Sequence, residues 1–182
     1  MNPSKSNDAG SETSGFRSYP VDQALNIIRS IAEHRWPMTV DEAFSLRDQF
    51  GWTPAPDDGR FFVTPVSNGE EDGAISIDRE NRIYISGIRF KLTSQLPKDA
   101  DPNTQSEMRS IYSSYVESLT MRYSTGEARS SSDVDGVLWH LPSRVSVDIG
   151  ITHRSISVVI ESPAMTALTE SEEKYFAEGG EP

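Results

Sequence analysis

Apolar and polar residues alternate most regularly between Arg144 and Glu161. The apolar residues occupy every second position of two runs separated by His153 and Arg154, a period typical of half-buried β-strands. If the chain folds back at this dipeptide, all of these apolar side chains lie on one face, as an antiparallel hairpin requires. The expected cross-strand pairs are Val147 with Ile160, Ile149 with Val158, and Ile151 with Ile156.

The same pattern decides how His153, one of three histidines in the chain, is interpreted. The residue falls at the turn, away from the buried face. Because His-Arg is an unfavourable pair for a two-residue turn, a four-residue loop from Thr152 to Ser155 is a reasonable variant. A general base needs a positioned partner in a sheltered site, and a solvated turn offers neither. We therefore interpret His153 as a turn residue.

Helical periodicity marks two segments early in the chain. Apolar residues spaced three and four apart predict a helix over residues 20–35, which ends before Pro37 because a residue that precedes proline avoids helical geometry. Thr39 and Glu42 form a capping box, which predicts a second helix that ends near Gly51.

Two later segments also favour helices. Thr104 and Glu107 repeat the capping signature and predict a helix that runs to about Ser124. The Ser-Pro pair at 162–163 is a favourable start for a short amphipathic helix before the chain ends. Between these two helices, the polar residues 124–136 predict the most flexible loop of the body.

Strand-forming runs fill the remaining body of the chain. They cover residues 60–66, 74–78, 82–93 and 137–141. Within the third run the apolar side chains change from odd to even positions at Gly87, which predicts a β-bulge and a curved sheet. Pro65 lacks a backbone donor and therefore indicates an edge or an end of its strand.

The expected order of elements is ααβββαβββ, followed by a weak helix. We therefore predict an α+β fold in which helices pack against an antiparallel, curved sheet of about six strands. A chain of 182 residues can bury one core, so a single domain over residues 20–163 is expected. Residues 1–19 predict a disordered arm, and residues 164–182 predict a short helix with an acidic, disordered tail.

The net charge of the chain is -11, and the acidic excess is unevenly distributed. Residues 57–80 hold seven acids and two bases, and the last 21 residues hold five acids and one base, whereas residues 81–161 are balanced. Such a surface should repel nucleic acid and anionic membranes and can attract a basic partner. Solubility alone is the plainer interpretation.

Motifs of several common enzyme classes are absent from the sequence. Without cysteine there is no disulfide, thiolate metal site or cysteine nucleophile, which fits a cytoplasmic location. There is no secretory signal and no apolar run that could span a bilayer. His34, His140 and His153 lie in separate elements, so no metal site is expected. The glycine-rich nucleotide loops and the nucleophile elbow are missing, so we expect neither catalysis nor a cofactor.

One segment combines acids with aromatic residues. The acids, which lie in loops close to Trp52 in the sequence, are Asp57, Asp58, Glu70, Glu71 and Asp72. Acids beside aromatic residues can form an electrostatically steered patch with hydrophobic anchors, and Trp139 is a second candidate anchor. The alternative is that the aromatic residues belong to the core and the acids are merely solvated.

The stretch MTVDEAFSLRDQFGW, with the later LWHLPSRVSVDIGITHRSISVVIESP, resembles small uncharacterised bacterial proteins of about this length. It is also similar to the immunity proteins that protect a cell against its own secreted polymorphic toxins. The resemblance covers approximately residues 36–163 and rests on helix and hairpin patterning and a W-x-L entry, so no residue role carries over. It implies direct binding and occlusion of a toxin domain, with an acidic surface where the toxin is a basic nuclease.

We therefore expect a cytoplasmic protein-binding module of immunity type. It would block a basic toxin domain stoichiometrically, through the acids between Asp57 and Asp72. The alternative is a secretion chaperone that holds an exported protein on an apolar sheet face, a contact that salt should weaken little. A third hypothesis is an enzyme with an unfamiliar site, which would need a deep pocket that gathers His140 with carboxylates.

Overall fold

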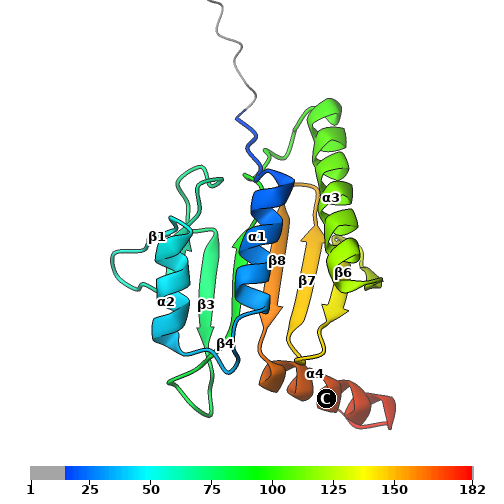
Figure 1. Cartoon of the computed structure of the whole chain (residues 1–182). Helices are drawn as coiled ribbons and strands as arrows, with labels where there is room; N and C mark the ends of the chain where they lie inside the picture. The colour runs from blue at the N-terminus through cyan, green and yellow to red at the C-terminus, as the bar shows by residue number, and fades with distance from the viewer. Residues whose placement is uncertain (1–14, 182) are drawn as a thin grey trace, which may run out of the picture.

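One antiparallel sheet of eight strands organises the chain, in the order β1-β2-β3-β4-β8-β7-β6-β5. The structure is a computed structural model that describes residues 15–181. The strands are β1 (Thr53–Pro54), β2 (Phe61–Val63), β3 (Gly73–Ile77), β4 (Ile85–Lys91), β5 (Glu127–Ser130), β6 (Asp135–His140), β7 (Ser146–Ile151) and β8 (Ile156–Glu161). Each half of the sheet is a meander, and the pairing of β4 with β8 joins the two halves (Figure 1).

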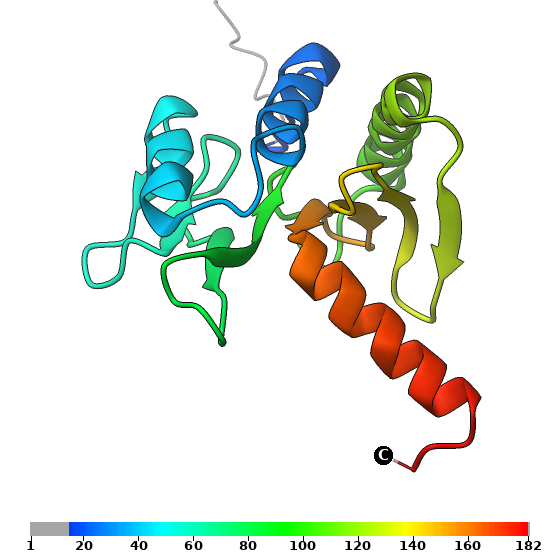
Figure 2. The same cartoon turned by 60° about the horizontal axis from the view of Figure 1, so that its bottom comes forward.

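Three helices lie on one face of this sheet (Figure 1). They are α1 (Val21–Ala32), α2 (Val40–Gln49) and α3 (Pro102–Tyr123). The fourth helix, α4 (Pro163–Ala177), follows β8 and projects on the side away from the other three (Figure 2). Apart from the start of α4, no element within residues 15–181 covers the second face, which we call the uncovered face. No helix in this part of the chain has the length and hydropathy needed to cross a bilayer.

The predicted α+β class and the curved antiparallel sheet are confirmed, but the sheet has eight strands where about six were expected. Strand β1 has two residues, too few to produce a recognisable alternation. Strand β5 lies within the segment predicted to be a flexible loop. All four of its residues are exposed, so the alternation of apolar and polar residues that normally reveals a strand is missing.

The C-terminal hairpin has the predicted register. Val147 pairs with Ile160, Ile149 with Val158, and Ile151 with Ile156. The turn is the four-residue variant, in which the Thr152 N–H donates to the Ser155 carbonyl at 3.0 Å. The apolar alternation therefore determined this pairing without help from distant parts of the chain.

The predicted bulge is also present. Ser76 of β3 pairs with Gly87, whereas the next residue, Ile77, pairs with Ile85. Ser86 is therefore the extra residue of β4, directly beside the glycine where the apolar pattern changes phase. The bulge lets one strand present apolar side chains to the helices before and after the irregularity.

The predicted start of α2 agrees with the structure, whereas the predicted start of α3 does not. The capping box of α2 is present, with the Glu42 N–H donating to the Thr39 hydroxyl at 3.1 Å. The predicted cap of α3 at Thr104 is wrong, because Asp101 caps this helix by accepting from the Asn103 N–H at 2.8 Å. Pro102 occupies the first helical position, where its missing N–H has no cost, so the helix begins earlier.

The predicted N-terminal arm is too long. Tyr19 is buried, its N–H donates to the Leu92 carbonyl at 3.0 Å, and its own carbonyl accepts from the Tyr115 hydroxyl at 2.5 Å. Residues 15–19 therefore belong to the folded body, while residues 1–14 lie outside the described residues. At the other end, α4 has 15 residues and is longer than the predicted short helix, and residues 178–181 follow it.

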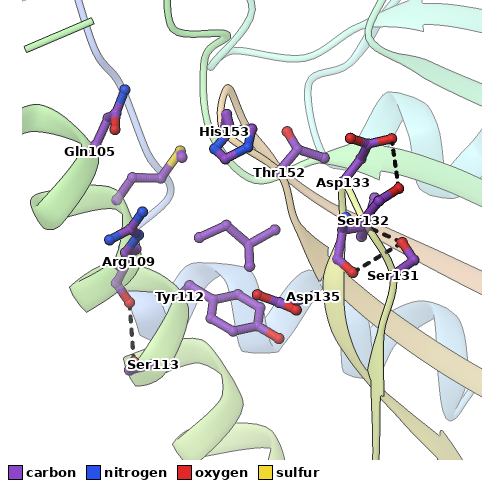
Figure 3. A pocket seen from close by; sticks show the side chains of 13 residues that line it. Gln105, Arg109, Tyr112, Ser113, Ser131, Ser132, Asp133, Asp135, Thr152 and His153 are labelled. Atoms are coloured by element: carbon purple, nitrogen blue, oxygen red, sulfur yellow. Dashed lines mark hydrogen bonds between the residues drawn. The ribbon is translucent and has the colours of Figure 1, made fainter. Parts of the chain in front are cut away.

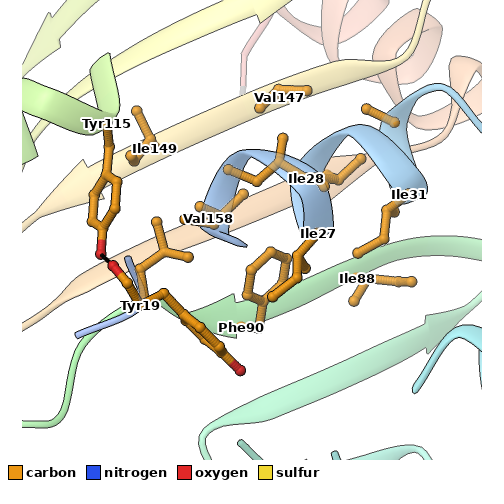
Figure 4. Packing of buried hydrophobic residues seen from close by; sticks show 14 of the residues in the cluster. Tyr19, Ile27, Ile28, Ile31, Ile88, Phe90, Tyr115, Val147, Ile149 and Val158 are labelled. Atoms are coloured by element: carbon orange, nitrogen blue, oxygen red, sulfur yellow. Dashed lines mark hydrogen bonds between the residues drawn. The ribbon is translucent and has the colours of Figure 1, made fainter. Parts of the chain in front are cut away.

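The core lies between α1 and the centre of the sheet (Figure 4). From α1 it contains Ile27, Ile28 and Ile31, and from the strands it contains Ile88, Phe90, Val147, Ile149 and Val158, all of which are buried. Each such side chain contributes about 1.5–3 kcal/mol relative to an exposed one. Because this burial uses one side of β4, β7 and β8, their alternate residues face the uncovered side.

Substituting Gly87 with alanine should destabilise the protein, because a Cβ there would lie 2.8 Å from the Ile160 carbonyl oxygen. We expect the Gly87→Ala variant to lose about 1–3 kcal/mol of unfolding free energy in urea denaturation. Gly15→Ala is the control, since no atom lies within 4 Å of the added Cβ. Unchanged stability of Gly87→Ala would mean that β4 and β8 are not packed this closely.

Candidate binding surfaces

The structure places both predicted tryptophan anchors in the core. Trp52 is 2% exposed, its ring stacks on Phe62 with 4.6 Å between centroids, and its Nε1–H donates to the Tyr19 hydroxyl at 3.0 Å. Trp139 is equally buried, and its Nε1–H donates to the Ser124 carbonyl at 2.8 Å. The prediction that they anchor a partner is wrong, because both rings are already desolvated within the fold.

The five predicted acids do not form one continuous exposed patch. The Arg60 Nε–H donates to both oxygens of Asp58 at 2.9 Å, and hydrogen bonds from Arg60 lower the pKa of this carboxyl to about 2. Asp72 is 7% exposed and accepts from the Thr64 backbone N–H at 2.7 Å, while burial raises its pKa. The exposed acids of the five are Asp57, Glu70 and Glu71. Two of the five therefore serve the fold.

A different pair of carboxylates lies on the uncovered face, on β7 and β8. Asp148 pairs with Val159 and Glu161 pairs with Ser146, positions that alternate with the core-facing residues of both strands. Asp148 and Glu161, which we call the acidic pair, are both half-buried. Arg129 of β5 approaches them, with its Nη1 3.8 Å from the Asp148 carboxylate.

The electrostatic environment of the acidic pair disfavours ionisation. Burial raises the pKa of Asp148, and the charge of Arg129 opposes this effect only in part. Burial also raises the pKa of Glu161, and the negative charge of Asp148 raises it further. Folding has therefore partly desolvated two neighbouring carboxylates, and among residues 15–181 the ion pair with Arg129 is the only one that either carboxylate forms. A basic group from another molecule would favour the charged form of both.

A shallow groove of about 230 Å³ runs beside Glu161 on the same face. Val159 and small residues of β3 and β4 line it, and Arg89 adds a positive charge. Met165, from the first turn of α4, also lines the groove. The groove is therefore bordered by the uncovered face and by the first turn of α4.

Helix α4 presents large apolar side chains to solvent. They are Leu168 (51% exposed), Tyr175 (56%) and Phe176 (52%). Its first turn is attached to the body, since the Ser162 hydroxyl caps the helix and Thr166 is buried. One turn further, Glu170 forms an ion pair with Arg144 of the β6–β7 turn. The combination of acids and exposed aromatic residues that was predicted for residues 52–72 is thus found on α4.

The turn that carries His153 borders a polar cleft of about 230 Å³ (Figure 3). Arg109 and Tyr112 line the cleft from α3, and Asp133 and Asp135 line it from the β5–β6 turn. His153 is exposed, and no hydrogen bond to its ring is present among residues 15–181. It is a turn residue, as predicted, although its position beside a cleft was not anticipated.

The three histidines do not come together. His140 is exposed at the end of β6 and lines neither the groove nor the cleft. His34 follows the end of α1 and lines neither the groove nor the cleft. Within the described part of the chain, no three residues of metal-ligating type are grouped.

Comparison with known proteins gives a family match over most of the chain. Residues 22–162 match the sequence profile described as "Family of unknown function (DUF6301)". The chain belongs to this family. No curated protein and no solved structure matches it.

The DUF6301 match covers the acidic pair but not α4. It extends from the start of α1 through β8 and ends at Ser162, the residue that caps α4. The uncovered face is thus part of the region shared by the family, whereas α4 lies beyond it. Since the family description assigns no activity, the resemblance to immunity proteins remains a proposal.

Substituting Asp148 with asparagine tests whether the acidic pair lowers the stability of the fold at neutral pH. A carboxyl whose pKa is raised in the folded state stabilises the fold at low pH, and this contribution is lost as the pH rises through the folded pKa. Asparagine cannot ionise, so Asp148→Asn should be more stable than the wild type at about pH 7, with a smaller advantage at about pH 4. Urea midpoints at both pH values measure this difference.

The control for this experiment is Asp57→Asn, which removes the same charge from an exposed turn and should change stability little. If Asp148→Asn proves less stable than the wild type at neutral pH, the ion pair with Arg129 outweighs the effect of burial.

Proposed function

We propose that this chain is a non-catalytic protein-binding module of immunity type, which binds a basic protein stoichiometrically and blocks its functional surface. The acidic pair on the uncovered face is the observation that carries the proposal. Its two carboxylates are half-buried and mutually repulsive, and their one ion pair is with Arg129, while Arg89 lines the groove beside Glu161. A lysine or arginine from a partner would supply the missing positive charge.

The shape of the surface favours a protein over a small molecule. Pockets that enclose small ligands usually measure about 300–1,000 Å³ and bury most of the ligand. The groove and the cleft are each smaller and open, at about 230 Å³. A third hollow beside His34 and Arg122 measures about 330 Å³ but is more open to solvent than either, so it does not enclose a ligand. An extended sheet face with a shallow groove suits the broad, nearly flat contact of a protein–protein interface.

Partial burial of the acidic pair also favours binding on energetic grounds. An ion pair across an interface often gains little, because both charges must first lose their water. Here folding has already removed part of the water around Asp148 and Glu161. A cation that reaches them would form charge-assisted hydrogen bonds at a lower desolvation cost than on a fully solvated surface. The exposed acids of residues 57–71 would add long-range attraction rather than the central contact.

A secretion chaperone is the second candidate, and one observation favours it. The exposed apolar side chains of α4 could hold an apolar segment of a client protein. Such a contact would depend less on charge, so its response to salt separates it from the immunity proposal.

The test is affinity purification of the tagged chain from its own host, alongside the double variant Asp148→Asn/Glu161→Gln. The wild type should retain one basic protein in about equal amount and release it at high salt, because the contact is electrostatic. The double variant should bind this protein about tenfold or more weakly in a titration of the purified pair, since paired interfacial charges are worth several kcal/mol.

Asp57→Asn/Glu71→Gln provides the matched control, because it removes two charges from exposed loops and leaves the acidic pair intact. If the Asp148/Glu161 variant retains the partner and this control loses it, the binding site lies in the acidic loops and not at the acidic pair. A partner that resists high salt would support the chaperone, and the absence of any retained protein would count against both.

A further inference from the structure

The exposed apolar residues of α4 form a stripe along one side of the helix. Leu168, Glu172 and Tyr175 are spaced four and three residues apart, which places them on the same face. Met165 continues this face toward the body, where it lines the groove beside Glu161. The stripe therefore has an acid between apolar residues and leads directly into the groove of the uncovered face.

The far end of this stripe is structurally defined. Gly179 adopts a left-handed conformation with φ of 89°, and the Gly180 N–H donates to the Tyr175 carbonyl at 3.0 Å, so the helix has a regular C-terminal cap. The Tyr175 ring packs edge-on against Phe176, with 5.6 Å between centroids, and lies close to Gly180. The aromatic residues are thus positioned before any partner arrives, which lowers the entropy lost on binding.

The negative charge of α4 limits which kind of molecule can bind to this stripe. After its first turns α4 carries Glu170, Glu172 and Glu173 against Lys174 alone, and Glu178 follows as its C-cap. A second copy of the chain would bring the same negative charge to the contact. Residues 1–14 have one lysine, two acids and no large apolar residue besides Met1, so they do not offer a basic, apolar surface. A segment that is both basic and apolar complements the stripe.

We infer that α4 docks an amphipathic, basic segment of a partner protein. Apolar side chains of this segment lie on Leu168 and Tyr175, and a lysine or arginine between them meets Glu172. Because α4 projects on the side of the uncovered face (Figure 2), the same segment can continue along the groove toward the acidic pair. The inference rests on the proposed function and specifies the chemistry of its partner.

The test uses a fluorescent 18-residue helical peptide built from leucine and lysine, with all leucines on one face, and the full chain. We expect the wild type to bind it in an anisotropy titration, and Leu168→Ala/Tyr175→Ala to bind about tenfold or more weakly, as is usual for central apolar contacts. Alanine retains helix propensity, and circular dichroism checks that α4 still forms. Met121→Ala removes an 84% exposed apolar side chain from α3 and should leave binding unchanged.

Further outcomes separate this inference from the proposed function. Equal binding by Leu168→Ala/Tyr175→Ala and the wild type overturns the role of α4, and loss of binding only in Asp148→Asn/Glu161→Gln would then leave the acidic pair as the site. Loss of binding in Leu168→Ala/Tyr175→Ala but not in Asp148→Asn/Glu161→Gln would support α4 as the site and exclude the acidic pair. If a leucine–glutamate peptide binds equally well, the occupant of α4 is not basic. If the wild type sediments as a dimer and the α4 variants do not, the occupant is a second copy of the chain.

Discussion

Strand β8 is the element on which the rest of the structure depends, because it hydrogen-bonds to β7 on one side and to β4 on the other. Val158 consequently faces Ile149 in one neighbour and Phe90 in the other. This double pairing turns two four-stranded meanders into one sheet and creates the broad apolar surface on which α1 packs. Gly87 makes the β4 side possible, since a side chain there would meet the backbone of β8.

The same pairing produces the asymmetry that gives the molecule a candidate function. Alternate residues of β7 and β8 must point away from the core, and in the described part of the chain no helix layer covers them. Polar residues are therefore expected there, but Asp148 and Glu161 are only half exposed, and Arg129 of β5 lies 3.8 Å from the Asp148 carboxylate. The fold thus carries two carboxylates whose surroundings oppose their charge, and titratable groups with shifted pKa values often gather at functional sites.

The acidic pair lies within the family match and α4 lies outside it, and the two surfaces differ in chemistry. The pair lies in the region that matches DUF6301, on strands whose positions the core determines. Helix α4 lies beyond the match and is attached mainly through its first two turns. In the proposed interface, the sheet face would supply charge recognition at a rigid position. The projecting helix would add apolar contact and selectivity, in a form that can vary without disturbing the core.

The sequence by itself determined the local parts of this protein. The hairpin register, the capping box at Thr39 and the bulge beside Gly87 each depend on hydrogen bonds and apolar spacing within a few residues. It also assigned the α+β class correctly, because helical and strand periods differ. Strand β5 was not predicted, because its exposed residues do not alternate between apolar and polar. The cap at Asp101 was not predicted, because Thr104 and Glu107 also match a capping box.

Only the tertiary structure decided which of the candidate residues are buried and which are exposed. Burial of Trp52 depends on Tyr19 and Phe62, and burial of Trp139 depends on the chain around Ser124, contacts that no local pattern encodes. Alternation placed Asp148 and Glu161 opposite the core but could not show that they would be half-buried and close to Arg129. Solvent exposure and electrostatic environment are sums over distant segments, so they become defined only when β4 and β8 have paired.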